Sequence, residues 1–346
     1  MKRILIISLI LLAAISCDEP ETVVTNYIHP DGTITRRIEM RNIKNKFESL
    51  QVPFDTSWVV TDSIEVNEKG DTTWVKRAEK LFKNAEEINS AYRLDSGLNR
   101  DVPRHASFEK KFRWFNTEYR FSEQIDKKVN NGFLISDFLN EEELLYFYSP
   151  ESLRNEYENG PDSVKYKLLK DSVNYKTDIW SYKNFVLASM DKFIDLIGGR
   201  EGQEFIAGAL ENNKNEMLDL YKKQGDDLDS LWNNGIVLKD AIGENYAAKY
   251  RSEADSAIST VTSDLWLNFK EYSVRIVMPG KLTGTNGFID KSKMLLWPVR
   301  SDYFLSQNYE MWAQSKVPNI WTWIVSGVFL LFVLTGITIR IIKKAE

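Results

Sequence analysis

The chain reads IWTWIVSGVFLLFVLTGITI from Ile320 to Ile339, a run of 20 residues without a charge. An α-helix rises ~1.5 Å per residue, so this run would be ~30 Å long, which is the thickness of the hydrocarbon layer of a membrane. Trp321 and Trp323 lie at its beginning, and tryptophan is enriched at membrane–water interfaces. The run therefore predicts a membrane-spanning helix with these two tryptophans as interfacial anchors.

The far end of the run is basic. Arg340, Lys343 and Lys344 follow it, and the cytoplasmic ends of membrane spans carry an excess of lysine and arginine. We predict a transmembrane helix over residues 318–340 and a cytoplasmic tail over residues 341–346. So short a tail can hold no catalytic or signalling domain. A buried core helix is the alternative, and the length, the missing charge and the basic end argue against it.

Residues 1–16 have the organisation of a secretory signal peptide, with a basic start, an apolar run and small residues before a cleavage site. The apolar run, residues 4–15, is too short to span a membrane, which takes ~20 residues. It ends in Ala14-Ile15-Ser16-Cys17, which resembles the lipobox of bacterial lipoproteins, where the cysteine is lipidated and becomes the first residue of the mature chain. We predict that Cys17, the only cysteine of the chain, is lipidated. Ordinary signal-peptidase cleavage is the alternative, because the lipobox usually has leucine where Ala14 stands.

The two anchors together predict the location of the chain. Apolar spanning helices belong in an inner membrane, since outer membranes hold β-barrels. We therefore expect a protein of the bacterial inner membrane, with its main domain in the periplasm and its C-terminus in the cytoplasm. The membrane is then the first predicted partner.

Composition narrows the possible functions. A net charge of −5 and a pI near 5.5 argue against a nucleic-acid-binding protein, whose surface carries a basic patch. With 43% hydrophobic residues, the chain can bury a core. Only His29 and His105 are histidines, too few for a multi-histidine metal site, and we expect neither a metal nor a cofactor.

Hydrophobic patterns divide the exported chain into three regions. Strand patterns dominate residues 17–135, helical patterns run through residues 136–260, and strand patterns return in residues 261–317. We predict an α+β fold, in which an antiparallel β-sheet domain contains a large helical insertion and is followed by one C-terminal transmembrane helix. The predicted strands are residues 22–28, 33–40, 57–66, 72–81, 108–125, 271–278 and 303–316, with a short helix at 83–92 and a loop at 95–107.

Two local signals support the helical region. Asn140, followed three residues later by Glu143, has the spacing of a capping box. A long helix is predicted from Asp162 or Ser163 to the pair Gly198-Gly199, with one buried apolar stripe along it. The stripe consists of Val164, Leu168, Ile179, Val186, Met190, Phe193 and Ile197.

Several turn-forming segments near the two ends of the chain carry a family resemblance. They are Pro30-Asp31-Gly32, Pro279-Gly280 and Thr285-Asn286-Gly287, followed by Trp297 and then one membrane span with a basic tail. This arrangement resembles that of LppM-like lipoprotein domains, over the two ends of the chain and not over the helical insertion. The resemblance implies an architecture and a location at a membrane, and no catalytic residue comes with it.

No motif commits the chain to a chemistry. Residues 141–143 are three consecutive glutamates, but successive helical positions point in different directions, so we interpret them as a solvated helix start. Residues 225–229 contain three aspartates without the spacing of a calcium loop. The chain has no G-x-S-x-G and no phosphate-binding glycine motif. We therefore predict no catalytic residue, and a protein that is not an enzyme.

Three functional hypotheses follow. The leading one is a non-catalytic, membrane-anchored lipoprotein whose periplasmic domain binds an envelope protein or an amphiphile at the membrane surface. The second is a hydrolase that acts on envelope polymers or lipids through carboxylates of the helical region. The third is an accessory subunit that holds a membrane complex together through its spanning helix.

Overall fold

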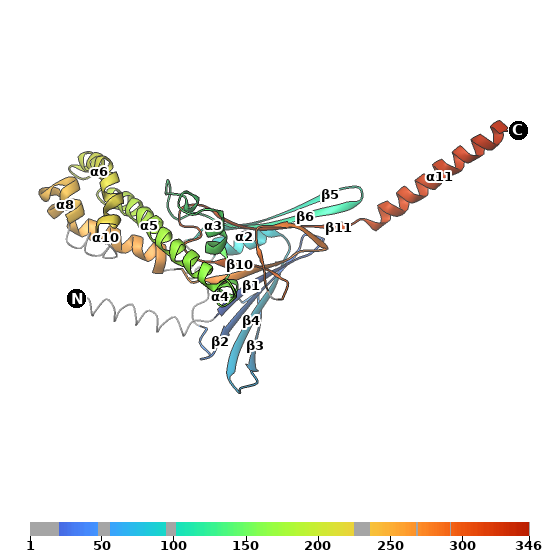
Figure 1. The fold of residues 1–346 in the computed structure, drawn as a ribbon, viewed down its shortest axis with the longest axis horizontal. Coiled ribbons are helices and arrows are strands. Elements are labelled where there is room, and N and C mark those ends of the chain that lie inside the picture. Colours follow the sequence, from blue (N-terminus) through green and yellow to red (C-terminus); the bar gives the residue numbers. More distant parts are fainter. Residues whose placement is uncertain are drawn as a thin grey trace.

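A computed structural model describes residues 21–47, 56–94, 102–224, 236–267, 269–290 and 292–345. It confirms the α+β class, because the described residues form two β-sheets, a helical insertion and a C-terminal apolar helix (Figure 1). The molecule is elongated. The helical insertion lies at one end and helix α11 (Ile320–Ala345) at the other, with the two sheets between them.

The larger sheet, sheet A, combines strands from both ends of the exported chain, in the order β3-β4-β2-β1-β7-β10-β9. Its neighbouring strands are antiparallel except β1 and β7, which pair in parallel from Val23 beside Ser273 to Tyr27 beside Val277. A parallel pair needs a long crossover connection, and here the crossover contains the helical insertion. The strands are β1 (Glu21–Ile28), β2 (Ile34–Asn42), β3 (Val59–Val66), β4 (Thr72–Phe82), β7 (Tyr272–Val277), β9 (Phe288–Ile289) and β10 (Leu295–Val299).

The smaller sheet, sheet B, has the order β5-β6-β11-β8 and leads into α11. The prediction of one long strand over residues 108–125 is wrong. This stretch contains most of β5 and all of β6, two antiparallel strands in which Phe112 pairs with Thr117 across a turn at residues 113–115. Strand β5 also includes His105, which was predicted to lie in a loop. The strands are β5 (Arg104–Phe112), β6 (Asn116–Ile125), β8 (Lys281–Thr285) and β11 (Tyr309–Pro318).

The core lies between the inner faces of the sheets. Every second residue of β2 and of β6 is buried, as expected for strands with one face in a core. Ile34 and Met40 of β2 and Phe121 of β6 are fully buried, and burying such a side chain stabilises the fold by ~1.5–3 kcal/mol. Helix α2 (Ala85–Arg93) joins this core and is held to β5 by a hydrogen bond from Asn89 Nδ2 to the carbonyl of Ala106 at 3.0 Å.

The turn at residues 285–287 links the two sheets, because it connects β8 of sheet B to β9 of sheet A. Asn286 Oδ1 accepts hydrogen bonds from Trp297 Nε1 and from the backbone N–H of Trp312, both at 2.9 Å. A Cβ at Gly287 would lie 2.4 Å from the Trp297 ring, so this position requires glycine. The turn segment and the tryptophan that carry the family resemblance thus form one packed unit.

The helical insertion follows sheet strand β6 and ends shortly before β7. Helix α5 is its backbone and extends away from the sheets, with α6, α8 and α10 gathered at its far end (Figure 1). The described helices are α3 (Glu141–Tyr148), α4 (Glu151–Glu158), α5 (Ser163–Leu196), α6 (Gln203–Gln224), α8 (Ile236–Ile242), α9 (Glu244–Lys249) and α10 (Arg251–Thr262). The predicted long helix is confirmed, and its C-terminus is followed by Gly198 and Gly199.

The capping box at the start of α3 is confirmed, and its glutamate is not solvated as predicted. Asn140 Oδ1 accepts from the backbone N–H of Glu143 at 3.0 Å, and Glu143 Oε2 accepts from the backbone N–H of Asn140 at 2.9 Å. Glu143 is buried and also binds Lys176 and Ser172 of α5. Only the first two glutamates of this cluster are exposed.

The predicted apolar stripe of α5 is buried only in part. Val186, Met190 and Phe193 are buried, whereas Val164 and Leu168 are 75% and 66% exposed. No residue of α5 before Val173 is buried. The first three turns of this helix therefore present apolar side chains to the surroundings.

Candidate functional site

The structure places the predicted anchor residues at the two ends of α11. Trp321 and Trp323 lie in its first turn and are more than half exposed, and Arg340, Lys343 and Lys344 are exposed near its other end. The helix is long and apolar enough to cross a membrane, and none of its apolar window is buried inside the described protein. Cys17 and the predicted signal peptide lie outside the described residues.

An aromatic cluster that the sequence analysis missed lies against the start of α11. It comes from the turn between β5 and β6, and we call Phe112, Trp114 and Phe115 the aromatic tip. The ring of Phe112 is stacked on Trp321 with centroids 6.3 Å apart, and Trp114 meets the same ring edge-on at 5.7 Å. Phe115 lies 4.4 Å from the Trp323 ring. A break in the polar–apolar alternation at residues 113–115 was the sequence signal for this turn.

Asn319 joins the aromatic tip to α11. Its backbone N–H donates to the carbonyl of Phe115 at 3.0 Å, and its side-chain amide donates to the carbonyl of Arg113 at 2.7 Å. Its side-chain oxygen accepts from the Thr117 hydroxyl at 2.9 Å. The backbone carbonyl of Asn319 accepts from Thr322 in the first turn of α11. Helix and hairpin turn are therefore connected by a set of hydrogen bonds and not by a free linker.

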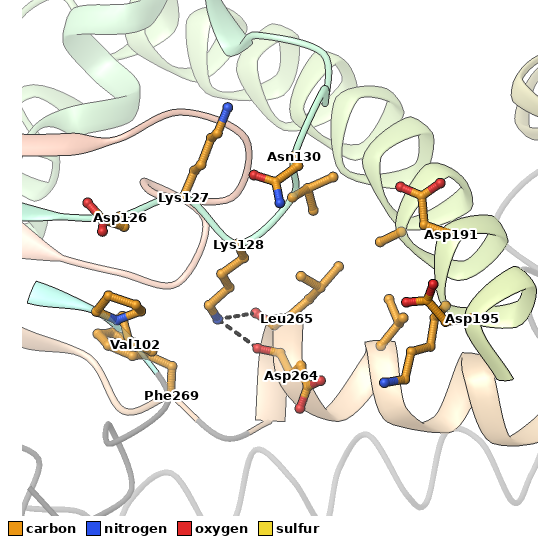
Figure 2. Close-up of a pocket in the computed structure, with 15 residues that line it drawn as sticks. Val102, Asp126, Lys127, Lys128, Asn130, Asp191, Asp195, Asp264, Leu265 and Phe269 are labelled. Atoms are coloured by element: carbon orange, nitrogen blue, oxygen red, sulfur yellow. Dashed lines mark hydrogen bonds between the residues drawn. The ribbon is translucent and has the colours of Figure 1, made fainter. Parts of the chain in front are cut away.

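A second candidate site is a pocket of about 540 Å³ where the sheets meet the helical insertion. Lys128 enters it from the segment after β6, and Asp191 and Asp195 face it from α5 (Figure 2). Lys128 Nζ donates to the carbonyls of Asp264 and Leu265 at 2.8 and 3.0 Å. These carbonyls belong to the helical turn that continues α10, and carbonyls at a helix C-terminus lack intrahelical partners. Lys128 therefore acts as a cap for this helix end.

The protonation states in the pocket are shifted by burial. Burial lowers the pKa of Lys128 to about 8. Burial, and after it the neighbouring Asp195, raises the pKa of Asp191. Because carboxylates and amines both line the pocket, it suits a polar ligand more than a polymer of one charge.

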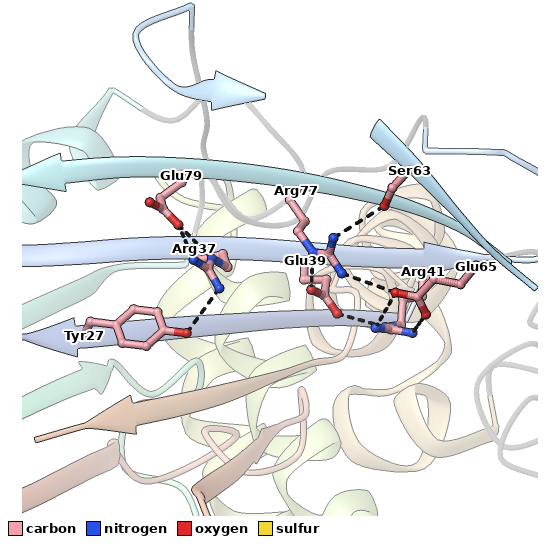
Figure 3. Close-up of polar contacts among 8 residues, drawn as sticks. All are labelled: Tyr27, Arg37, Glu39, Arg41, Ser63, Glu65, Arg77 and Glu79. Carbon is pink, nitrogen blue, oxygen red and sulfur yellow. Dashed lines mark hydrogen bonds and ion pairs between the residues drawn. The ribbon is translucent and has the colours of Figure 1, made fainter. Parts of the chain in front are cut away.

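The outer face of sheet A is polar. Ion pairs connect β2, β3 and β4 across it, among them Arg37 with Glu79 at 2.7 Å and Arg77 with Glu39 at 2.6 Å (Figure 3). Arg41 contacts Glu39 and also Glu65 of β3. These charges make much of this face polar, although Val59 of β3 and Leu81 of β4 are also 69% and 61% exposed.

The inner face of the same sheet contains a buried ion pair. Arg36 of β2 donates to Glu123 of β6 at 2.7 Å, and both side chains are at most 2% exposed. Arg36 also donates to Asn26 Oδ1 at 2.8 Å and to the hydroxyl of Tyr92, which in turn donates to Glu123. Burial raises the pKa of Tyr92, so its hydroxyl keeps the proton that it donates. The cluster connects the two sheets, and its enclosure keeps it from acting on a ligand.

Metal ligation has no support in the described part of the chain, where no group of three or more His, Cys, Asp or Glu residues is placed to hold an ion. The acidic segment at residues 225–229 lies outside the described residues.

Comparison with known proteins gives a distant resemblance of fold. No family model matches the chain, and the comparison with curated proteins found no match. The NMR structure of the folded domain of LppM from Mycobacterium tuberculosis is similar at 9% sequence identity and a TM-score of 0.26, over 88% of this chain and 94% of that chain. A likeness this weak transfers no residue role and no activity.

Lys128 should make the stability of the protein depend on pH between about 8 and 10.4. Its pKa is about 8 in the folded state, while an unfolded lysine titrates near ~10.4. In this window the unfolded state binds more protons, so the free energy of unfolding rises with pH. We expect the wild-type protein to gain stability relative to Lys128→Met as the pH rises through this window, in denaturant unfolding of the detergent-solubilised chain. Lys127→Met controls for removal of a charge. If the stability difference between the wild-type protein and Lys128→Met does not change with pH, the lowered pKa of Lys128 is contradicted.

Arg36 and Arg37 are neighbours on opposite faces of sheet A and offer a matched pair of variants. Arg36→Gln leaves Glu123 buried without its cation, and breaking a buried ion pair costs ~3–5 kcal/mol. Arg37→Gln removes a pair with Glu79 in which both side chains are 42% exposed, and such pairs contribute ~0–1 kcal/mol. Denaturant unfolding at neutral pH should show this difference. Equal losses for the two variants would show that the buried cluster does not hold the sheets together.

Proposed function

We propose that this chain is a bacterial lipoprotein of the inner membrane, with a single span and a periplasmic α+β domain that binds a partner without catalysis. The observation that carries the proposal is α11, an apolar helix with no buried part in its membrane-length window. Leaving so large an apolar surface in water is unfavourable. The hydrocarbon layer of a lipid bilayer would remove this apolar surface from water.

The orientation follows from the two ends of α11. Trp321 and Trp323 lie at the end joined to the domain, and Arg340, Lys343 and Lys344 lie at the other. The positive-inside rule assigns the basic end to the cytoplasm, and the domain then lies outside. The proposed lipid on Cys17 would be a second anchor for the same domain.

The proposed partner is an envelope protein that contacts the first half of α5. Val164, Leu168 and Tyr175 are 75%, 66% and 61% exposed, and their spacing of four and seven residues places them on one face of the helix. Exposed apolar residues gathered on one face are typical of protein-binding surfaces. The ion pairs across the outer face of sheet A make this stretch of α5 the better candidate surface of the two.

The span and the lipid can be tested separately by alkaline carbonate extraction of membranes. The wild-type chain and Cys17→Ser should both stay in the membrane pellet, because a spanning helix is not extracted by carbonate. A chain that ends at Pro318 should stay only if Cys17 is intact and lipidated. Release of Cys17→Ser into the soluble fraction would contradict the span, and an unmodified Cys17 in mass spectra of the mature protein would contradict the lipid.

The partner surface can be tested by a photo-crosslinking residue in place of Leu168 in intact membranes. We expect a discrete adduct that is weakened by Val164→Glu, since a charge on the same face would have to be buried against the partner. Position 211 on α6, where Glu211 is 69% exposed, is the control. The same adducts at both positions would show random collision and contradict the proposed surface.

A further inference from the structure

We infer that the aromatic tip of the β5–β6 hairpin inserts into the bilayer interface beside α11, as a further membrane-binding element that prefers anionic phospholipid. The inference rests on the proposed span. The three rings of the tip, Phe112, Trp114 and Phe115, are 56%, 48% and 41% exposed although they are packed on Trp321 and Trp323. The two groups of rings form one continuous aromatic surface, with two rings from the helix and three from the hairpin.

The depth of the tip follows from a single hydrogen bond. Trp114 Nε1 donates to Ser326 Oγ at 2.9 Å. Ser326 is six residues beyond Ile320, which corresponds to ~9 Å along the helix axis. Interfacial elements bury their apolar side chains ~5–10 Å into the boundary between headgroups and acyl chains. When α11 crosses a bilayer with its tryptophans at the interface, Trp114 therefore lies within this layer and not in water.

Several backbone groups of the tip have hydrogen-bond partners within the protein. Polar backbone groups in a membrane need partners within the protein. Asn319 donates to the carbonyls of Arg113 and Phe115, and the N–H of Arg113 donates to the carbonyl of Asn116 at 2.8 Å. These groups therefore lose little when the turn leaves water.

Two exposed cations, Lys111 and Arg113, alternate with the aromatic side chains of the tip. Each is 62% exposed, and they pair with Glu109 at 2.9 Å and with Glu118 at 3.4 Å. Exposed pairs of this kind contribute little to stability, so both cations remain available to lipid headgroups. Long basic side chains can keep their charge among headgroups while an adjacent ring is buried. Each such cation near an anionic surface adds ~1 kcal/mol of attraction. Anionic phospholipid is thus the lipid class that this surface fits.

The test uses single cysteines in the full-length Cys17→Ser chain, labelled with an environment-sensitive dye and reconstituted in vesicles of phosphatidylcholine and phosphatidylglycerol. Arg113→Cys reports the tip, Val333→Cys the middle of α11, and Lys69→Cys the turn between β3 and β4. Nitroxide groups attached high or low on the acyl chains quench dyes at matching depths. We expect the shallow nitroxide to quench the dye at position 113, the deep one to quench that at 333, and neither to quench that at 69.

The outcomes separate this inference from the span. A dye that is as unquenched at position 113 as at 69, while 333 is quenched, would overturn insertion of the tip and leave the span intact. Loss of quenching at 333 would overturn the span itself. Lipid preference is tested with the dye at Phe115→Cys, a tip position 41% exposed in the wild-type protein, so that Lys111 and Arg113 are both kept. Quenching there by the shallow nitroxide that is the same in vesicles without phosphatidylglycerol would overturn the preference for anionic lipid.

Discussion

The hydrogen bonds of Asn319 are the constraint on which the placement of the whole domain depends. This residue lies between the last residue of β11 and the first of α11, and it contacts the turn between β5 and β6 through its backbone and its side chain. Strand β11 is paired with β6 from Tyr309 to Pro318. The direction of α11 is therefore coupled to sheet B, and an anchor that fixes the helix in a bilayer also fixes the sheet above it.

Two further contacts extend this coupling to sheet A. The turn at residues 285–287 packs on Trp297, and Arg36 reaches across the core to Glu123. The desolvation free energy of Arg36 and Glu123 offsets much of the free energy gained from their mutual attraction. Their value is therefore more in alignment than in net stability, because hydrogen bonds among Arg36, Asn26, Tyr92 and Glu123 are satisfied in one arrangement of the sheets.

The sequence predicted those elements whose signal is local. Helix α11, the hairpin of β1 and β2, the capping box at Asn140 and the long helix α5 all follow from spacing within one segment. The turn between β5 and β6 was missed because bulky residues fill positions 113–115 and no glycine or proline marks the bend.

Contacts between distant segments could not be predicted in the same way. The parallel pairing of β1 with β7 joins residues about 250 positions apart, and alternation within a strand carries no information on its neighbour. Arg36 and Glu123 are 87 positions apart. Periodicity likewise predicted the apolar stripe of α5. It could not predict that no other segment of the described chain packs on the stripe in the first turns of this helix, where Val164 and Leu168 are exposed. The aromatic tip was missed for both reasons. Its turn carries no glycine or proline, and its contact with α11 joins segments that are far apart in the sequence.

The two proposed anchors also restrict the orientation of the domain relative to the membrane. Three residues lie between Cys17 and Glu21, and the four Cα–Cα steps reach at most ~14 Å. Strand β1 begins at Glu21 beside Pro150 and α4, well away from the start of α11 (Figure 1). If the lipid and the span hold one bilayer, this side of the domain must approach the lipid surface while Asn319 stays at the interface. The long axis of the molecule would then tilt towards the membrane plane and bring α5 close to the bilayer, where a membrane-bound partner could reach it. Ordinary signal-peptidase cleavage would leave the chain without a lipid anchor near Glu21. The hydrogen bonds of Asn319 to the β5–β6 turn would then set the tilt of the domain.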